Sequence, residues 1–197
     1  MLQLFVSASM ACISSFFLKA EIFYLMIPVG VVSLLYAGRF IHPGLAGLRE
    51  IPFSKAFIVS ITWILVTVGL PIIYSDHGFD LNLVFFVIGR FLFILALAVL
   101  FDYRDRSIDD QSMRTMPQIF GKMGSLWLVS IMVTCSVIFE IWSGIVTVYS
   151  TLPVGLCALV LTFLAPNNKS DFFYSFYVDG LLLLPALFLF AQIIISG

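Results

Sequence analysis

The sequence predicts an all-α integral membrane protein, a polytopic bundle of about seven transmembrane helices. Hydrophobic residues make up 61% of its 197 residues and charged residues only 11%, whereas soluble domains average about half apolar and a quarter charged. The mean hydropathy is +1.12. The apolar runs are continuous rather than alternating, which favours spanning helices over the strands of a membrane barrel. With 10 Lys+Arg against 11 Asp+Glu, no basic surface exists for binding nucleic acid.

Polar residues divide the chain into apolar segments close to the roughly 20 residues that a helix needs to cross a bilayer. Lys19 to Glu21 separates two short segments, a basic loop precedes the third, and SDHGFD precedes the fourth. A charged stretch follows the fourth, Glu140 closes the fifth, and APNNKSD precedes the last. The predicted helices are 2–18, 22–38, 55–74, 81–101, 118–140, 143–165 and 172–195. No repeat interrupts them, so residues 1–197 are predicted to form a single transmembrane domain.

The distribution of Lys and Arg predicts the orientation of these helices. If the loops alternate sides, three loops on one side hold eight of the ten basic residues: Arg39, Arg49, Lys55, Arg104, Arg106, Arg114, Lys122 and Lys169. The other side has only Lys19, and Arg90 lies within a helix. Because Lys and Arg collect in cytoplasmic loops, we expect a cytoplasmic N-terminus and an outer C-terminus. We expect a bacterial inner membrane, with the aspartate-rich loop facing the cytoplasm.

The stretch FDYRDRSIDDQSMRTMP, residues 101–117, is unusually rich in charge. Asp102, Asp105 and Asp109 are spaced i, i+3, i+7, so they share one face if the helix continues through them. Carboxylates so placed repel unless a cation neutralises them, and Mg²⁺ binds one or two carboxylates together with substrate phosphates. The stretch therefore predicts Mg²⁺ and a diphosphate-bearing ligand. Three arginines can bind phosphate oxygens directly: Arg104, Arg106 and Arg114. A solvated, charge-rich loop is the alternative.

Thr115, Met116 and Pro117 follow these aspartates. The order, D-x-x-D-x-x-x-D and then T-[LIM]-P, resembles the second aspartate-rich motif of the UbiA-type membrane prenyltransferases. A second segment, from Leu35 to Ile73, is similar to the loop and helix after the fourth helix of that family. Its matching residues are Tyr36, Arg49, Pro52, Lys55, Trp63 and Pro71. The resemblance covers roughly residues 20–190.

The resemblance implies an activity and a site. The family transfers an isoprenoid chain from an allylic diphosphate to a hydrophobic, often aromatic acceptor such as a quinone precursor, with Mg²⁺ holding the diphosphate. Cations stabilise the departing diphosphate in such a reaction. The resemblance implies metal binding by Asp102, Asp105 and Asp109. It implies diphosphate contacts from Arg49, Lys55, Arg106 and Arg114.

One part of the family pattern is missing. The family carries a first aspartate-rich motif after its second helix, but this sequence has no Asp before Asp76. The chain is therefore similar to the seven C-terminal helices of the family. Three explanations stay open: a longer native chain, a partner subunit, or a non-catalytic homologue that binds a lipid diphosphate or a partner. Whether the chain is an enzyme depends on which explanation holds.

Charged residues also occur inside the predicted helices. Arg90 lies about a dozen residues before Asp102, and an intramembrane Arg is usually paired. Asp179, about two turns into the last predicted helix, is the expected partner. Glu140 is expected to reach interfacial water at the outer end of its helix. The favoured interpretation is that Arg90 and Asp179 form a structural ion pair, and the alternative is that the pair lines a transport pathway.

Overall fold

The computed structural model describes residues 19–36, 48, 51–75, 78–109, 113–168 and 170–196. These residues form helices, turns and short connections without a β-strand, which confirms the all-α prediction. Among the described residues, four helices are long and apolar enough to cross a membrane: Ser54–Ser75, Leu81–Asp105, Met116–Ser143 and Val148–Asn167. Helix α2 (Ala20–Tyr36) is apolar but shorter. The predicted helix over 2–18 lies outside the described residues, so the count of seven spans stays a prediction.

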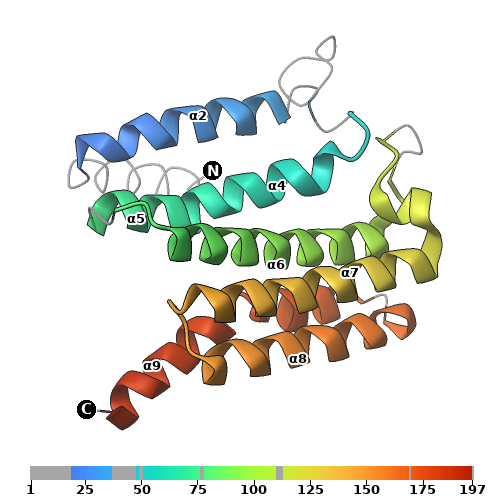
Figure 1. The fold of residues 1–197 in the computed structure, drawn as a ribbon. Helices are drawn as coiled ribbons and strands as arrows, with labels where there is room; N and C mark the ends of the chain where they lie inside the picture. The colour runs from blue at the N-terminus through green and yellow to red at the C-terminus, as the bar shows by residue number, and fades with distance from the viewer. Residues whose placement is uncertain are drawn as a thin grey trace, which may run out of the picture.

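The helices lie side by side in chain order (Figure 1). Helix α2 packs against α4 (Ser54–Ile64), and α4 packs against α6 (Leu81–Asp105). The most extensive packing joins α6 to α7 (Met116–Ser143), which then contacts α8 (Val148–Leu164). The segment after residue 170 passes behind α7 and α8 in this view (Figure 1). Helix α6 is therefore the central element, with neighbours on both sides.

The core of the bundle lies where α6 meets α7 and α8. Val99 and Leu100 of α6 and Val129 of α7 have no exposed surface, and Ala158 of α8 is equally buried. Gly89 permits the close approach of α6 to α7, because a Cβ atom at this position would lie 2.7 Å from Cγ of Glu140. Burial of apolar surface is thus greatest around α6, and side chains of the C-terminal segment such as Tyr174 belong to the same core.

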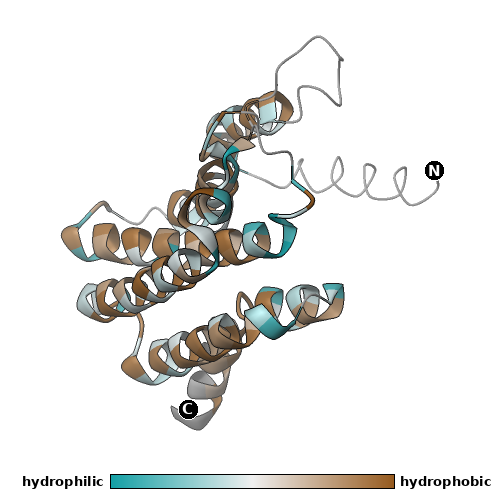
Figure 2. Cartoon of the chain, turned by 90° about the vertical axis from the view of Figure 1, so that its right-hand side faces the viewer, coloured by the Kyte–Doolittle hydropathy of each residue, from teal (hydrophilic) through white to brown (hydrophobic). Residues whose placement is uncertain are grey.

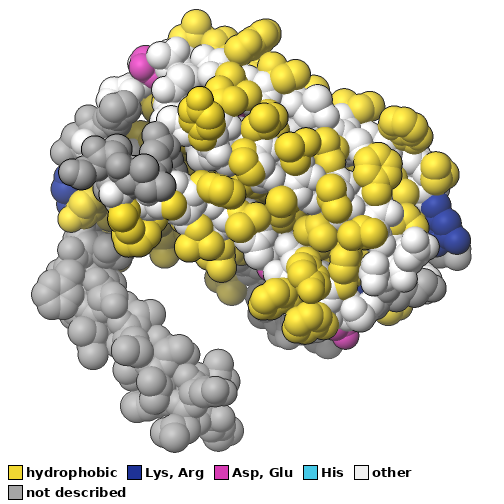
Figure 3. All heavy atoms as spheres, turned by 90° about the horizontal axis from the view of Figure 1, so that it is seen from below, with side chains coloured by type: hydrophobic (Ala, Val, Ile, Leu, Met, Phe, Trp, Pro, Cys, Tyr) yellow, Lys and Arg dark blue, Asp and Glu magenta, His cyan; other side chains and the backbone are white. Residues whose placement is uncertain are grey.

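Large apolar side chains cover the outside of the bundle. Trp127, Ile131 and Trp142 of α7 and Phe163 of α8 are all more than half exposed. Hydrophobic side chains are spread over the described part of the face shown in Figure 3, with charged side chains mainly at its edges, and Figure 2 shows apolar residues along the helices with hydrophilic ones mainly near their ends. An apolar surface of this extent requires an apolar solvent. The helices therefore fit an integral membrane protein in a lipid bilayer.

Two of the predicted continuous helices are irregular next to a proline. The span Ser54–Ser75 contains a π-helical segment, η2 (Leu65–Gly69), before α5 (Leu70–Ser75). The predicted helix 172–195 is interrupted by a turn at 181–183, between η5 (Phe173–Val178) and α9 (Leu184–Ser196). Each irregularity precedes a proline, Pro71 or Pro185, that cannot donate a bond to the carbonyl four residues earlier. Proline thus accounts for the place of both irregularities.

Candidate functional site

The charged end of the bundle, here called the Asp-rich end, contains the end of α6, the turn to Asp109 and the beginning of α4 and α7. Helix α6 continues through Asp102 and ends at Asp105, as the spacing predicts for these two residues. Asp109 lies beyond the helix, in a turn where its backbone N–H donates to the carbonyl of Asp105. The three aspartates are therefore not on one helix face, because the chain leaves the helix before the third.

Lys55 joins two of the three aspartates. It lies in the first turn of α4, and its Nζ is 2.9 Å from Oδ1 of Asp102 and 2.6 Å from Oδ2 of Asp109. The Asp102 side chain is only 4% exposed, and that of Lys55 19%. The ion pairs fasten the start of α4 to the end of α6. The structure thus brings the sequence-predicted residue Lys55 to the aspartates, as a partner of the carboxylates.

Asp105 has a different partner. Nε of Arg104 donates to Oδ1 of Asp105 at 2.6 Å, and Nη1 of Arg104 reaches the exposed Asp171 at 3.3 Å. The guanidinium also lies over the rings of Phe101 and Tyr174. Arg104 therefore connects α6 to the beginning of the C-terminal segment, and Asp105 pairs with Arg104 rather than with Lys55.

This arrangement decides how well a divalent cation fits. The carboxylates of Asp102 and Asp109 converge, but on the ammonium group of Lys55. Within the described part of the chain, no group of three or more His, Cys, Asp or Glu side chains is placed to hold a metal ion. The residues as arranged fit the Lys55 ammonium rather than Mg²⁺. The magnesium site thus stays a prediction from the sequence spacing.

Beside the aspartates lies a hollow of about 680 Å³, here called the basic hollow. Its charged lining residues are Arg106, Arg114 and Lys122, and no acidic side chain lines it among the described residues. Gly121 lies at its edge with a φ of 69° and interrupts the helical geometry of α7. The segment that begins at Lys122 therefore directs a helix N-terminus, which favours anions, toward the hollow.

Hydrogen bonds fix the N-terminal end of α7 beside this hollow. The side chain of Gln118 accepts from the backbone N–H of Thr115 at 2.9 Å, and its amide donates to the carbonyl of Asp109 at 3.2 Å. The order Thr-Met-Pro-Gln is an N-terminal capping pattern with proline in the first turn. Gln118 and Lys122 were not among the predicted site residues, although this capping pattern places both at the start of a helix.

The other predicted contacts are divided between the two groups. Arg106 and Arg114 line the basic hollow, whereas Lys55 lies among the aspartates. Arg49 lies outside the described residues. Lys19, predicted on the opposite side, donates from Nζ to the carbonyl of Tyr74 at the far end of α5. The described basic residues of the predicted cytoplasmic loops therefore gather at one end of the bundle.

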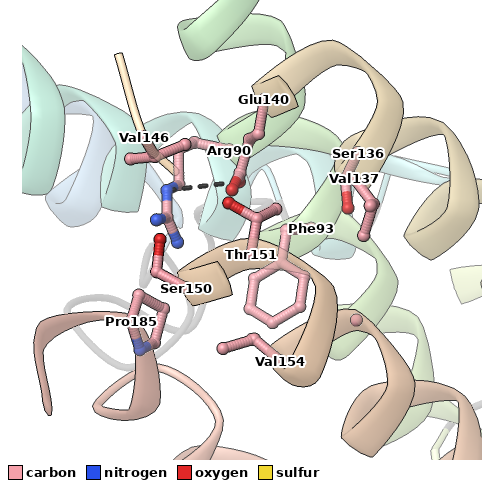
Figure 4. A pocket seen from close by; sticks show the side chains of 11 residues that line it. Arg90, Phe93, Ser136, Val137, Glu140, Val146, Ser150, Thr151, Val154 and Pro185 are labelled. Carbon is pink, nitrogen blue, oxygen red and sulfur yellow. Dashed lines mark ion pairs between the residues drawn. The ribbon is translucent and has the colours of Figure 1, made fainter. Parts of the chain in front are cut away.

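A second charged group lies inside the bundle. Nε of Arg90 on α6 is 3.2 Å from Oε1 of Glu140 on α7, and the two side chains are 17% and 5% exposed. Figure 4 shows this pair with the hydroxyls of Ser150 and Thr151 directed toward it. The prediction that Arg90 pairs with Asp179 was wrong, because Arg90 pairs with Glu140 instead. The prediction that Glu140 reaches interfacial water was also wrong, because the packing of α6 against α7 buries its side chain.

The structure defines a helical integral membrane protein with a charged end and a paired charge in its interior. In comparisons with protein-family models, curated proteins and solved structures, no match to this chain was found.

Proposed function

We propose that this protein binds the phosphate or diphosphate head group of a lipid in the basic hollow. One observation carries the proposal: three cationic side chains line one hollow of about 680 Å³. They are Arg106, which follows α6, Arg114, which precedes α7, and Lys122 near the beginning of α7. Arginine binds phosphate oxygens through two parallel hydrogen bonds, and a helix N-terminus adds a favourable dipole. The positive-inside distribution supports a cytoplasmic position for this end.

The surroundings of the hollow suit a head group that is attached to an apolar chain. Ile119 is 46%, Phe120 54% and Met123 66% exposed on the same turn of α7. These side chains lie on the apolar surface that continues along the helix. A phosphate held by the cations would leave a hydrocarbon tail free to lie against this surface, in the bilayer. An isoprenoid diphosphate has this amphipathic form.

A second candidate function is Mg²⁺-dependent transfer of the isoprenoid chain to a hydrophobic acceptor. The spacing of Asp102, Asp105 and Asp109, together with Thr115 to Pro117, favours it by the resemblance to UbiA-type prenyltransferases. In the present arrangement the ammonium group of Lys55 occupies the space between two of these aspartates. Binding without catalysis is therefore the function that the geometry supports better.

Binding is tested with the purified 197-residue protein in detergent, using farnesyl diphosphate and, for comparison, uncharged farnesol. We expect saturable binding of the diphosphate only, with an affinity that falls as salt is added. The triple variant R106Q/R114Q/K122Q is expected to lose at least about tenfold in affinity, because charge-assisted hydrogen bonds are lost. Lys19→Gln removes one cation at the other end and is the control. Unchanged affinity in the triple variant would overturn the proposal.

Catalysis is tested separately. The protein is incubated with farnesyl diphosphate and extracted membrane lipids, with Mg²⁺ or with EDTA, and released inorganic diphosphate is measured. Release that requires Mg²⁺ and is abolished by Asp102→Asn supports the transferase. Binding without release supports the binding protein.

A further inference from the structure

A second cavity, here called the interior cavity, lies between the helices away from the Asp-rich end and has a volume of about 660 Å³. It opens to the outside of the bundle, because Trp63 and Leu183 in its lining are 46% and 66% exposed. Its wall comes from three regions: the π-helical part of the span Ser54–Ser75, the middle of α6, and the interrupted C-terminal segment. Most of the lining is apolar, and three aromatic side chains contribute to it: Trp63, Phe86 and Phe93. Only two charged residues line it among those described, Arg90 and Asp179.

Arg90 does not make the cavity positive. Its guanidinium is paired with the Glu140 carboxylate at 3.2 Å and lies over the Phe86 ring, 5.4 Å from the centroid. The guanidinium and the carboxylate together have no net charge. An anionic ligand would therefore meet a cation that is already neutralised and would have to separate it from Glu140, which is unfavourable in a medium of low dielectric constant.

Asp179 supplies the excess charge. It is exposed, and it makes no ion pair with any described residue. Arg104 is the cation that acts on it at longer range, but Arg104 is already engaged by Asp105 and Asp171. Glu140 does not line the cavity, but it balances the charge of Arg90 from the side of α7, so the Asp179 carboxylate is the charge in the lining that no paired group balances. An ionisable residue at this depth normally faces a partner or an aqueous or ligand-filled space.

The backbone around the cavity is irregular on both sides. Thr67 and Val68 of η2 line it, and the turn at 181–183 begins directly after Asp179 and Gly180. The carbonyls of Asp179 and Gly180 accept tight-turn hydrogen bonds from Leu182 and Leu183, each at 3.0 Å. At membrane depth, non-helical backbone is tolerated where it is buried or lines a cavity. Both interruptions therefore shape the wall of the same space.

We propose that the interior cavity binds a lipophilic cation, an amine, quaternary ammonium or phosphonium group on an apolar or aromatic body. The positive charge would lie near Asp179, and the body would contact Trp63, Phe86 and Phe93. The volume is in the usual range for small-molecule sites, and aromatic rings attract desolvated cations. This proposal is independent of the proposed function, because the two sites have different residues and opposite charge preference.

The sign of the ligand charge is tested first with the wild-type protein. Tetraphenylphosphonium and tetraphenylborate have nearly the same size and shape but opposite charge. Binding to the 197-residue protein in detergent micelles is measured by equilibrium dialysis, with empty micelles as the blank. We expect saturable binding of tetraphenylphosphonium and only micelle partitioning of tetraphenylborate. Equal binding of both ions, or saturable binding of the borate alone, would contradict the proposal.

Two aspartates on the C-terminal segment provide a matched pair of variants. Asp179→Asn removes the charge of the cavity, and Asp171→Asn removes a charge eight residues earlier whose side chain is 92% exposed. We expect Asp179→Asn to weaken tetraphenylphosphonium binding at least about tenfold and Asp171→Asn to leave it unchanged. The same loss of affinity in both variants would show that general surface charge attracts the cation, and it would contradict a site at Asp179. Trp63→Leu is a third test, with an expected loss of about threefold or more.

Discussion

Lys55 at the Asp-rich end and Arg90 in the bundle interior are cations of similar exposure, 19% and 17%. The two carboxylates that hold Lys55 are 4% and 12% exposed, and the one that holds Arg90 is 5% exposed. They differ in charge balance. Lys55 faces two carboxylates, whereas Arg90 faces one. Near the end of the bundle, water and neighbouring basic residues can compensate an excess charge. Between the packed helices α6 and α7 they cannot, and Arg90 is matched by the one carboxylate of Glu140.

The largest expected effect comes from removing the interior partner. Glu140→Ala would leave the guanidinium of Arg90 buried without a carboxylate and should lower the free energy of unfolding by about 3–5 kcal/mol. The measurement is reversible unfolding in mixed detergent micelles. The double variant R90M/E140L removes both charges and should lie close to the wild type. A single variant as stable as the double would show that the pair is not desolvated.

Removing the cation at the Asp-rich end should lower the free energy of unfolding by less. Lys55→Met leaves Asp102 and Asp109 without their cation, and we expect a loss of about 1–3 kcal/mol in the same unfolding assay. Lys55→Arg keeps the charge and is the control. If Lys55→Met destabilises as strongly as Glu140→Ala, the Asp-rich end is as poorly solvated as the interior, and the comparison between the two regions fails.

Gly89 tests the close packing that buries the Arg90–Glu140 pair. In Gly89→Ala the new Cβ would lie 2.7 Å from Cγ of Glu140 and 3.0 Å from the carbonyl oxygen of Ser136. We expect a loss of about 1–2 kcal/mol from overpacking. Gly30→Ala is the matched control, because nothing lies within 4 Å of its Cβ position. Equal stability of the two variants would indicate that α6 and α7 are further apart.

The smallest effect is expected for Asp171→Asn. Its ion pair with Arg104 is 3.3 Å long, and its side chain is 92% exposed. Exposed pairs are weak, so the free energy of unfolding should change by less than about 0.5 kcal/mol. A loss above 1 kcal/mol would mean that Arg104 holds the C-terminal segment through this contact rather than through Phe101 and Tyr174.

The sequence alone determined the class of protein and much of its layout. Continuous apolar runs predicted the four long helices, and the gathering of basic residues in alternate loops predicted which described cations share one end. These properties can be predicted from the sequence because they depend on the hydrophobicity and charge of whole segments and not on contacts between them. The predicted helix 118–140 begins two residues after the observed start of α7 at Met116, which follows the capping residue Thr115.

Only the tertiary structure decided which charges meet. Asp102, Asp105 and Asp109 look alike in the sequence, but two of them pair with Lys55 and one with Arg104. Arg90 pairs with Glu140 rather than Asp179 because Gly89 lets α6 and α7 approach closely at that height. Such choices depend on how each helix is rotated and where it is interrupted. Both are set by packing between segments that lie far apart in the sequence.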